Sequence, residues 1–163
     1  MSRQFQFGAT LAGLLVLGGC ANEPTGSAVT EEPSFHFIPK QECVLTQGFW
    51  KNHPGALRER TPNDGINLGN HRYSENQLLA ILRTAPKGNG LIQLARQLIA
   101  AKLNGGEFDP NIDDVVDAAD ALIGNRVIPP VGNGFLHPSR TSRLIDKLTA
   151  FNEGRAGTPK CKG

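Results

Sequence analysis

The stretch LIQLARQLIAAKL, residues 91–103, has the clearest helical pattern in the chain. Its apolar side chains recur at three- and four-residue spacings, and Gln93, Arg96 and Gln97 lie on the opposite side. This pattern predicts an amphipathic helix with one face in a protein core. Gly105 follows the last apolar residue and is a natural end for the helix. The apolar positions are Leu91, Leu94, Ala95, Leu98, Ile99 and Leu103.

A second helix is predicted just upstream, in the segment HRYSENQLLAILRT, residues 71–84. Ser74 is of the type that caps a helix start, and Gln77 is placed to complete a capping box with it. Pro86 follows the apolar pattern and ends the helix, because proline lacks the amide hydrogen that a helix interior uses. The segment PKGNG then reads as a loop between the two helices.

Two further helices are predicted downstream. The first lies in DPNIDDVVDAADALIG, where Asp109 is the expected N-cap, Pro110 takes the first helical position and Gly124 follows the end. The second lies in SRTSRLIDKLTAFNEG, with Ser139 or Thr141 as its cap. Their expected core faces are Ile112, Val115, Val116, Ala119, Leu122 and Ile123 in the first, and Leu144, Ile145, Leu148 and Phe151 in the second.

The N-terminal part of the chain has the features of an export signal. Arg3 precedes the apolar run FGATLAGLLVLGGC, which is shorter than a membrane-spanning helix. The run ends in LGGC, residues 17–20, which resembles the lipobox of bacterial lipoproteins. The resemblance implies that residues 1–19 are a lipoprotein signal peptide and that Cys20 carries a lipid and begins the mature protein. An ordinary signal peptide that ends near a cysteine is the alternative.

Residues 20–42 are predicted to be a flexible tether between that lipid and a folded domain. They are rich in Pro, Thr, Ser and Glu and have no helical periodicity. A flexible coil of this length spans roughly 25 Å. Ala21 follows the predicted lipid site and differs from the Asp-type retention signal of inner-membrane lipoproteins. The protein is therefore expected to be exported and anchored to a membrane, which is the outer membrane if the host is Gram-negative.

The three cysteines of the chain become informative once Cys20 is assigned to a lipid. Cys43 and Cys161 then remain, one at each end of the predicted domain, and can pair only with each other. Export places them in an oxidising compartment, where a bond closing so long a loop stabilises the domain by about 4–5 kcal/mol in the chain-entropy model. Two free thiols are the alternative.

These observations predict an all-α fold for residues 43–163, a small disulfide-stapled bundle of about four helices. No segment has a convincing strand pattern, and no repeat recurs at a fixed period. The short connections favour antiparallel packing of consecutive helices.

The stretch CVLTQGFWKNHP, residues 43–54, contains the only tryptophan, Trp50. Because Trp50 lies close to the predicted disulfide, we expect its ring to fill one open end of the bundle. The other interpretation is a ligand contact, in which Trp50 stacks on a sugar ring while Asn52 and Gln47 bind its hydroxyl groups. Core packing is the favoured interpretation, since large aromatic rings are buried more often than not.

Metal binding is weakly supported. The candidate zinc ligands are His53, His71 and His137, and none of them forms an HxxxH, HxH or HExxH pattern. The residues that match positions one, three, five, nine and twelve of a calcium loop are Asp109, Asn111, Asp113, Asp117 and Asp120. Asp114 stands where that loop needs glycine, and the apolar spacing favours a helix instead. No metal or other cofactor is therefore predicted.

The charge pattern and the known catalytic motifs exclude several classes of function. The net charge is +2, and basic and acidic residues are interspersed, which is unlike a nucleic-acid-binding surface. The chain has no GxSxG motif and no phosphate-binding GxxxxGK[ST] loop. No pair of carboxylates is fixed by its spacing.

Taken together, the segments TQGFWKNHP, LGNHRYSENQLLAIL, KGNGLIQLARQLIAAKLN and DAADALIG resemble a module of predicted exported bacterial proteins. That module has a cysteine followed by TQG[FY]WK and a helix of the form LAxQLIAAKLN, and the resemblance covers nearly all of residues 43–161. It implies a compact exported domain and brings no activity or site residues. The charged stretch RERTPNDG departs from the pattern.

The sequence therefore predicts a membrane-anchored envelope lipoprotein with a non-catalytic helical domain that binds a partner or serves structurally. Its expected partners are the membrane, through the lipid on Cys20, and a cell-wall component, a glycan or an envelope protein, but no nucleic acid. Two alternatives stay open. One is a glycan-binding module centred on Trp50, and the other is an exported metal-dependent hydrolase.

Overall fold

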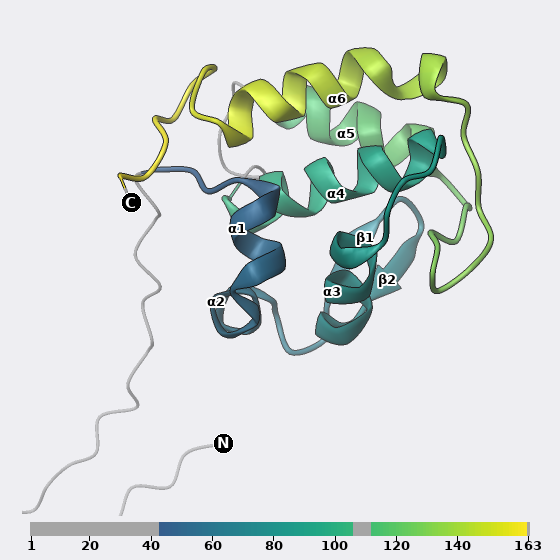
Figure 1. Cartoon of the computed structure of the whole chain (residues 1–163), viewed down its shortest axis with the longest axis horizontal. Coiled ribbons are helices and arrows are strands. Elements are labelled where there is room, and N and C mark those ends of the chain that lie inside the picture. The colour runs from purple at the N-terminus through teal and green to yellow at the C-terminus, as the bar shows by residue number, and fades with distance from the viewer. Residues whose placement is uncertain (1–42, 106–111, 163) are drawn as a thin grey trace, which may run out of the picture. The chain divides into compact units, whose positions relative to one another are not determined.

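The structure is a computed structural model that describes residues 43–105 and 112–162 (Figure 1). The contacts of the chain divide it into two units, Met1–Phe37 and Ile38–Gly163, and every described residue belongs to the second. This second unit contains the disulfide and the whole described apolar core, which is what a domain requires to fold alone.

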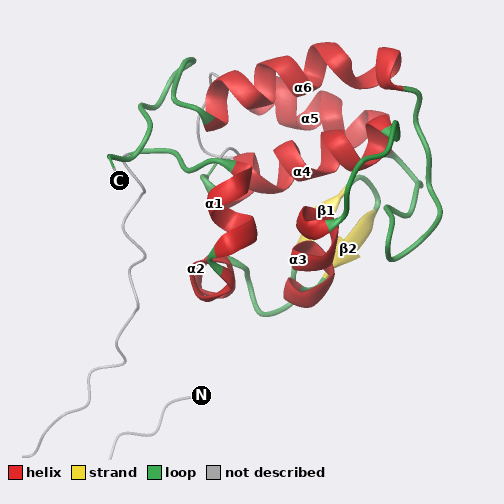
Figure 2. Ribbon diagram, viewed as in Figure 1, coloured by secondary structure: helices red, strands yellow, loops and turns green. Residues whose placement is uncertain are grey.

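The described residues form mostly helices, with one small antiparallel sheet (Figure 2). The helices are α1 (Gln47–Asn52), α2 (Pro54–Arg60), α3 (Glu75–Arg83), α4 (Gly90–Leu103), α5 (Asp113–Ile123) and α6 (Pro138–Asn152), and the strands are β1 (Ile66–Leu68) and β2 (His71–Tyr73). None of these helices is long and apolar enough to cross a membrane.

Helix α4 is the centre of the fold, as its sequence pattern predicts. Most of its side chains are buried, and α1, α3, α5 and α6 all pack against it (Figure 1). Its contact with α6 is close, because a Cβ atom on Gly90 would lie 2.5 Å from Thr141 Oγ1 and 3.0 Å from Pro138 Cα. Glycine at this position therefore lets the first turns of α4 and α6 meet.

The other predicted helices are also present: α3 starts as predicted, and α5 and α6 start at other residues. Helix α3 has the predicted capping box between Ser74 and Gln77. Helix α5 begins at Asp113, whereas the predicted cap Asp109 lies outside the described residues. Helix α6 begins at Pro138 and is capped by His137, so the expected cap at Ser139 or Thr141 is wrong. The cause is local: His137 Nδ1 accepts the Ser139 N–H at 3.3 Å, and Pro138 takes the first helical position.

The prediction of a largely helical, disulfide-linked fold is confirmed, but the bundle of about four helices is not. Among the described residues, the additional elements are α1, α2 and the hairpin β1–β2, in which Ile66 pairs with Tyr73 and Leu68 with His71. Gly69 in the hairpin turn has a φ of 60°, a conformation that glycine adopts readily. The Tyr73 hydroxyl accepts the Ile128 N–H at 2.9 Å and so ties the hairpin to the loop before α6.

Candidate functional site

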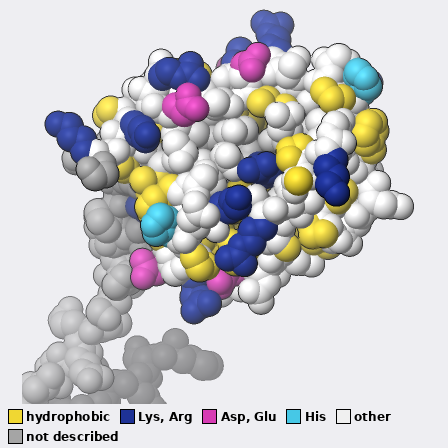
Figure 3. Space-filling model, in the orientation of Figure 1, with side chains coloured by type: hydrophobic (Ala, Val, Ile, Leu, Met, Phe, Trp, Pro, Cys, Tyr) yellow, Lys and Arg dark blue, Asp and Glu magenta, His cyan; other side chains and the backbone are white. Residues whose placement is uncertain are grey.

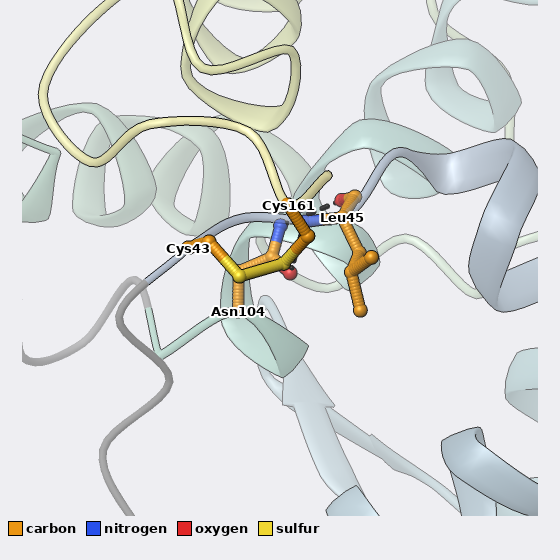
Figure 4. Close-up of a disulfide and its surroundings, with 4 residues drawn as sticks. All are labelled: Cys43, Leu45, Asn104 and Cys161. Carbon is orange, nitrogen blue, oxygen red and sulfur yellow. Dashed lines mark hydrogen bonds between the residues drawn. A yellow bond between two sulfur atoms is a disulfide. The ribbon is translucent and has the colours of Figure 1, made fainter. Parts of the chain in front are cut away.

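The two ends of the described unit meet at the disulfide between Cys43 and Cys161 (Figure 4), as the sequence predicts. Their Cα atoms are 4.8 Å apart. Beside the disulfide, the Val44 N–H donates to Pro159 O at 2.8 Å, and the Cys161 N–H donates to Val44 O at 3.0 Å. The start of the unit is therefore held to its end by one covalent bond and two backbone hydrogen bonds.

Asn104, just after α4, holds the same segment from the other side (Figure 4). Its Oδ1 accepts the Leu45 N–H at 3.0 Å, and its Nδ2 donates to Leu45 O at 2.8 Å. The side-chain amide thus pairs with Leu45 as a neighbouring strand would. Its Nδ2 also donates to Asn152 Oδ1 at 3.1 Å, and Asn152 Nδ2 donates to Gln97 O at 3.0 Å. This network joins the first residues of the described unit, Cys43 to Leu45, to the ends of α4 and α6; these three residues are called the entry segment below.

A groove of about 640 Å³ lies beside the disulfide, along one face of α1. Its lining combines an apolar aromatic floor, one amide and two lysines, and contains no acidic residue. The lining residues are Leu45, Thr46, Gly48, Phe49, Asn52, Lys160, Cys161 and Lys162. Of the three predicted ligand contacts, only Asn52 faces this groove.

Trp50 and Gln47 lie on another face of α1. Trp50 is 1% exposed, so its ring packs in the core and has no surface for a sugar. Gln47 Oε1 accepts a hydrogen bond from Arg96 Nη2 at 2.9 Å, and burial lowers the pKa of Arg96 from its ordinary value. Trp50 Nε1 and Arg96 Nε are buried and find no hydrogen-bond partner among the described residues. Trp50 thus lies in the core, as the favoured interpretation expects, and its buried ring does not face the groove.

Each of the three candidate histidines makes its own polar contact, and none of these contacts is with another histidine. His53 Nδ1 lies 2.9 Å from Phe49 O, and its ring stacks on Phe49 with centroids 4.1 Å apart. His71 Nε2 lies 3.0 Å from Asn125 O, and His137 Nδ1 lies 2.8 Å from Ser139 Oγ. Within the described part of the chain, no three His, Cys, Asp or Glu side chains lie close enough together to hold a metal ion.

The described residues of the calcium-loop match lie in helix α5, as the apolar spacing predicts. Asp113, Asp117 and Asp120 are all in that helix, while Asp109 and Asn111 fall outside the described residues. The two oxygens of Asp120 are already used: Oδ1 accepts the Gly69 N–H at 2.7 Å, and Oδ2 pairs with Lys102 Nζ at 2.7 Å. The Lys102 side chain is 7% exposed and that of Asp120 is 24% exposed, so this pair is a partly buried structural contact between α4, α5 and the hairpin turn.

A second surface, not predicted from the sequence, lies where the loop between α3 and α4 meets the loop before α6. Asn89 joins the two loops. Its Oδ1 accepts the N–H groups of Leu91 at 2.9 Å and Leu136 at 3.3 Å, and its Nδ2 donates to Gly134 O at 2.8 Å. The Gly90 N–H also donates to Leu136 O at 2.8 Å. The only sequence signal for this contact is the helix-capping preference of Asn89.

Comparisons of the chain with protein-family models, curated proteins and solved structures found no match. The similarity of residues 43–161 to the exported bacterial module therefore stays a prediction. Cys20, the predicted lipid site, lies outside the described residues.

Proposed function

We propose that the chain is an exported bacterial lipoprotein whose helical unit is a non-catalytic binding domain, held at a membrane by a lipid on Cys20. The observation that carries the proposal is the pairing of Cys43 with Cys161, together with the LGGC stretch upstream. Such disulfides are rare in the cytosol and persist in oxidising compartments. An oxidising compartment outside the cytosol is the location that an export signal implies. In a Gram-negative host we expect the outer membrane.

The way in which the unit begins also supports a tethered domain. Cys43, Val44 and Leu45 are fixed by the disulfide, by backbone bonds to Pro159 and Cys161, and by the amide of Asn104. A pull on the tether therefore meets three kinds of attachment before it reaches the helices. A domain fastened to a membrane at its N-terminal side benefits from such an entry, since a frayed start would expose the core at Val44 and Trp50.

The proposal is tested by feeding producing cells a clickable palmitate analogue and isolating the protein. We expect the label on the wild-type chain, its loss in Cys20→Ala, and its retention in the Cys43→Ser, Cys161→Ser double variant. The wild-type protein should also sediment with membranes and be released by protease digestion of the tether. Unlabelled wild-type protein, or label that survives in Cys20→Ala, would contradict the proposal.

A second candidate function is glycan binding at the groove beside α1, and Asn52 is the observation that favours it. Asn52 and Phe49 line that groove together with two lysines, so it offers an amide, an aromatic edge and positive charge to an acidic sugar. Titration with cell-wall fragments, followed by the melting temperature of the unit, tests this candidate. A rise that is lost in Asn52→Ala supports it, and an unchanged melting temperature rejects it.

A further inference from the structure

The loop between α5 and α6 exposes apolar side chains that the core does not use. Among the described residues, the exposed large hydrophobic side chains are Val131, at 39%, and Phe135, at 58%, and both lie in this loop. The loop lies at the end of the unit where α6 begins, away from Cys43 and the C-terminus (Figure 1). A mobile loop can expose an aromatic side chain without any function. The packing of this loop therefore shows whether Phe135 is held in a fixed position.

This loop is firmly packed beneath its exposed side chains. A Cβ atom on Gly132 would lie 2.5 Å from Val127 Cβ, and one on Gly134 would lie 2.6 Å from Leu91 Cδ2. Asn89 binds the loop at Gly134 and Leu136, and Tyr73 accepts the N–H of Ile128. Phe135 is therefore presented on a fixed backbone, which lowers the entropy cost of using it as a contact.

The neighbouring loop contains the one non-glycine residue with a positive φ in the described part of the chain, Lys87. Lys87 and Gly88 have φ values of 45° and 82°, and the Asn89 N–H donates to Pro86 O at 2.8 Å, which is a type I′ turn. Asn and Gly are the residues that this turn favours at its first central position, so lysine is strained there. Strained backbone of this kind is found more often at functional sites than elsewhere.

The charged side chains of the two loops are all basic. Residues 84–90 and 124–140 contain Lys87, Arg126 and Arg140 and no aspartate or glutamate. Arg126 Cβ is close to the apolar loop, because a Cβ atom on Gly134 would lie 3.3 Å from it, and the Arg126 guanidinium donates from Nη1 to Leu122 O and Ile123 O at the end of α5. The corresponding side of the molecule, right of centre in Figure 3, exposes Lys, Arg and hydrophobic side chains and no acidic ones.

We propose that this end of the unit is a docking surface for an acidic segment of a partner protein, with Phe135 as its apolar anchor and Lys87 as its main cation. An acidic segment with one apolar side chain supplies both what Phe135 and Val131 pack against and the charge that Lys87 and Arg126 attract. A sugar would instead need several polar side chains directed at its hydroxyl groups, and this surface consists mainly of cations and apolar groups. A membrane is also disfavoured, because the described unit begins at Cys43, which is bonded to Cys161 near the C-terminus, at the opposite end of the unit (Figure 1).

The inference builds on the proposed binding role of the unit, but it can fail independently of the lipid anchor. The test therefore uses the unit Ile38–Gly163, which contains the complete described core and lacks Cys20. The probe is a fluorescent twelve-residue peptide that alternates glutamate with serine and has leucine at two central positions. Control probes replace glutamate with lysine or leucine with serine. Polygalacturonate and vesicles rich in phosphatidylglycerol complete the panel.

We expect the acidic leucine peptide to bind with a Kd on the order of 100 µM, in the range of weak transient contacts, and to weaken with added salt. The Phe135→Ser variant should weaken binding roughly tenfold. Lys87→Asn should weaken it about threefold while raising the melting temperature by about 2–5 °C, because asparagine relieves the strained turn. Lys147→Asn, on the exposed side of α6, is the matched control and should leave the affinity unchanged.

The opposed effects of Lys87→Asn separate a functional charge from a structural one. If the charge of Lys87 has no role in binding, Lys87→Asn should be more stable than the wild type and bind the acidic peptide with unchanged affinity. That result would overturn the proposal. Equal binding of the lysine peptide, the polysaccharide or the vesicles would overturn the choice of an acidic protein partner. Absence of peptide binding at millimolar concentration would overturn the docking surface and leave the lipid-anchor proposal intact, whereas failed labelling at Cys20 would do the reverse.

Discussion

Replacement of Asn104 is expected to release the start of the folded unit from α4. The Asn104 side chain is buried and makes three hydrogen bonds, two to the backbone of Leu45 and one to Asn152. Two variants separate the contributions. Asn104→Ala removes the amide, while Asn104→Asp keeps its size and shape and replaces the donating NH₂ group with a second oxygen.

The expected cost of Asn104→Ala is about 2–4 kcal/mol in the free energy of unfolding. Each net hydrogen bond contributes about 1 kcal/mol, and a buried polar group left without a partner costs about 1–3 kcal/mol. Leu45 is only half-buried, so water can replace part of what is lost there. Asn104→Asp should cost at least as much, because it places a carboxylate oxygen against Leu45 O and Asn152 Oδ1, where Nδ2 now donates.

Guanidinium unfolding of the unit Ile38–Gly163 measures both costs, with the fluorescence of Trp50, the only tryptophan, as the signal. Asn76→Ala, at an exposed position in α3, is the matched control and should change the stability by less than about 0.5 kcal/mol. If Asn104→Ala behaves like Asn76→Ala, or if Asn104→Asp is as stable as the wild type, the side-chain pairing with Leu45 is not what holds this segment.

Three further perturbations test the fold. The double variant Cys43→Ser, Cys161→Ser should lose about 5 kcal/mol, from the 118-residue separation of the cysteines, and equal denaturation midpoints for the wild type and the variant would refute this value. Burial raises the pKa of the Tyr73 hydroxyl above its ordinary value of about 10. Above about pH 10 the unfolded chain therefore loses this proton before the folded chain does, so the free energy of unfolding should fall as the pH rises further. Tyrosinate absorbance reports this directly, since the chain has one tyrosine, and titration at the ordinary pKa would contradict the burial. Gly90→Ala should cost about 1–3 kcal/mol by forcing α4 away from Thr141, and an unchanged melting temperature would show that the contact can relax.

The helices that sequence reasoning identified correctly are those with strong local signals. Helix α4 has a long apolar repeat, and α3 begins with a capping box formed by two residues close in sequence. Such signals do not depend on the rest of the fold, which is why they can be read without it. The start of α6 was misplaced because His137 caps it, and histidine is seldom the residue in that role.

The elements that sequence reasoning missed are short and depend on packing. Helices α1 and α2 are too short to be stable alone, so they form because Trp50 and Leu57 reach the core. The hairpin strands are also too short to show an alternating pattern. One signal was available, the Gly69-Asn70 pair between the strands, since Gly-Asn is a recognised two-residue hairpin turn.

The candidate binding surface was missed for a different reason. The segment PKGNG was read as a loop, and residues 86–89 do form one, while Gly90 already belongs to α4. Nothing local requires Lys87 to take a positive φ, a conformation that lysine disfavours. The turn is imposed by Asn89, whose side chain binds Gly134 and Leu136 far along the chain. The same long-range dependence hides the exposure of Phe135, because an apolar residue in an irregular segment is normally expected to point inward.

Asn89 and Asn104 flank the same helix, one just before its first residue and the other just after its last. Each uses its side-chain amide to bind the backbone of a distant segment: Asn89 holds the Phe135 loop, and Asn104 holds the entry of the chain at Leu45. Helix α4, with its 14 residues, spans about 21 Å at the rise of an α-helix, so it keeps these two ends apart. If the entry is fastened to a membrane, the docking surface is held beyond the tether by that further distance. A helix with an asparagine at each end thus fixes a distant segment of backbone at both ends of this small unit.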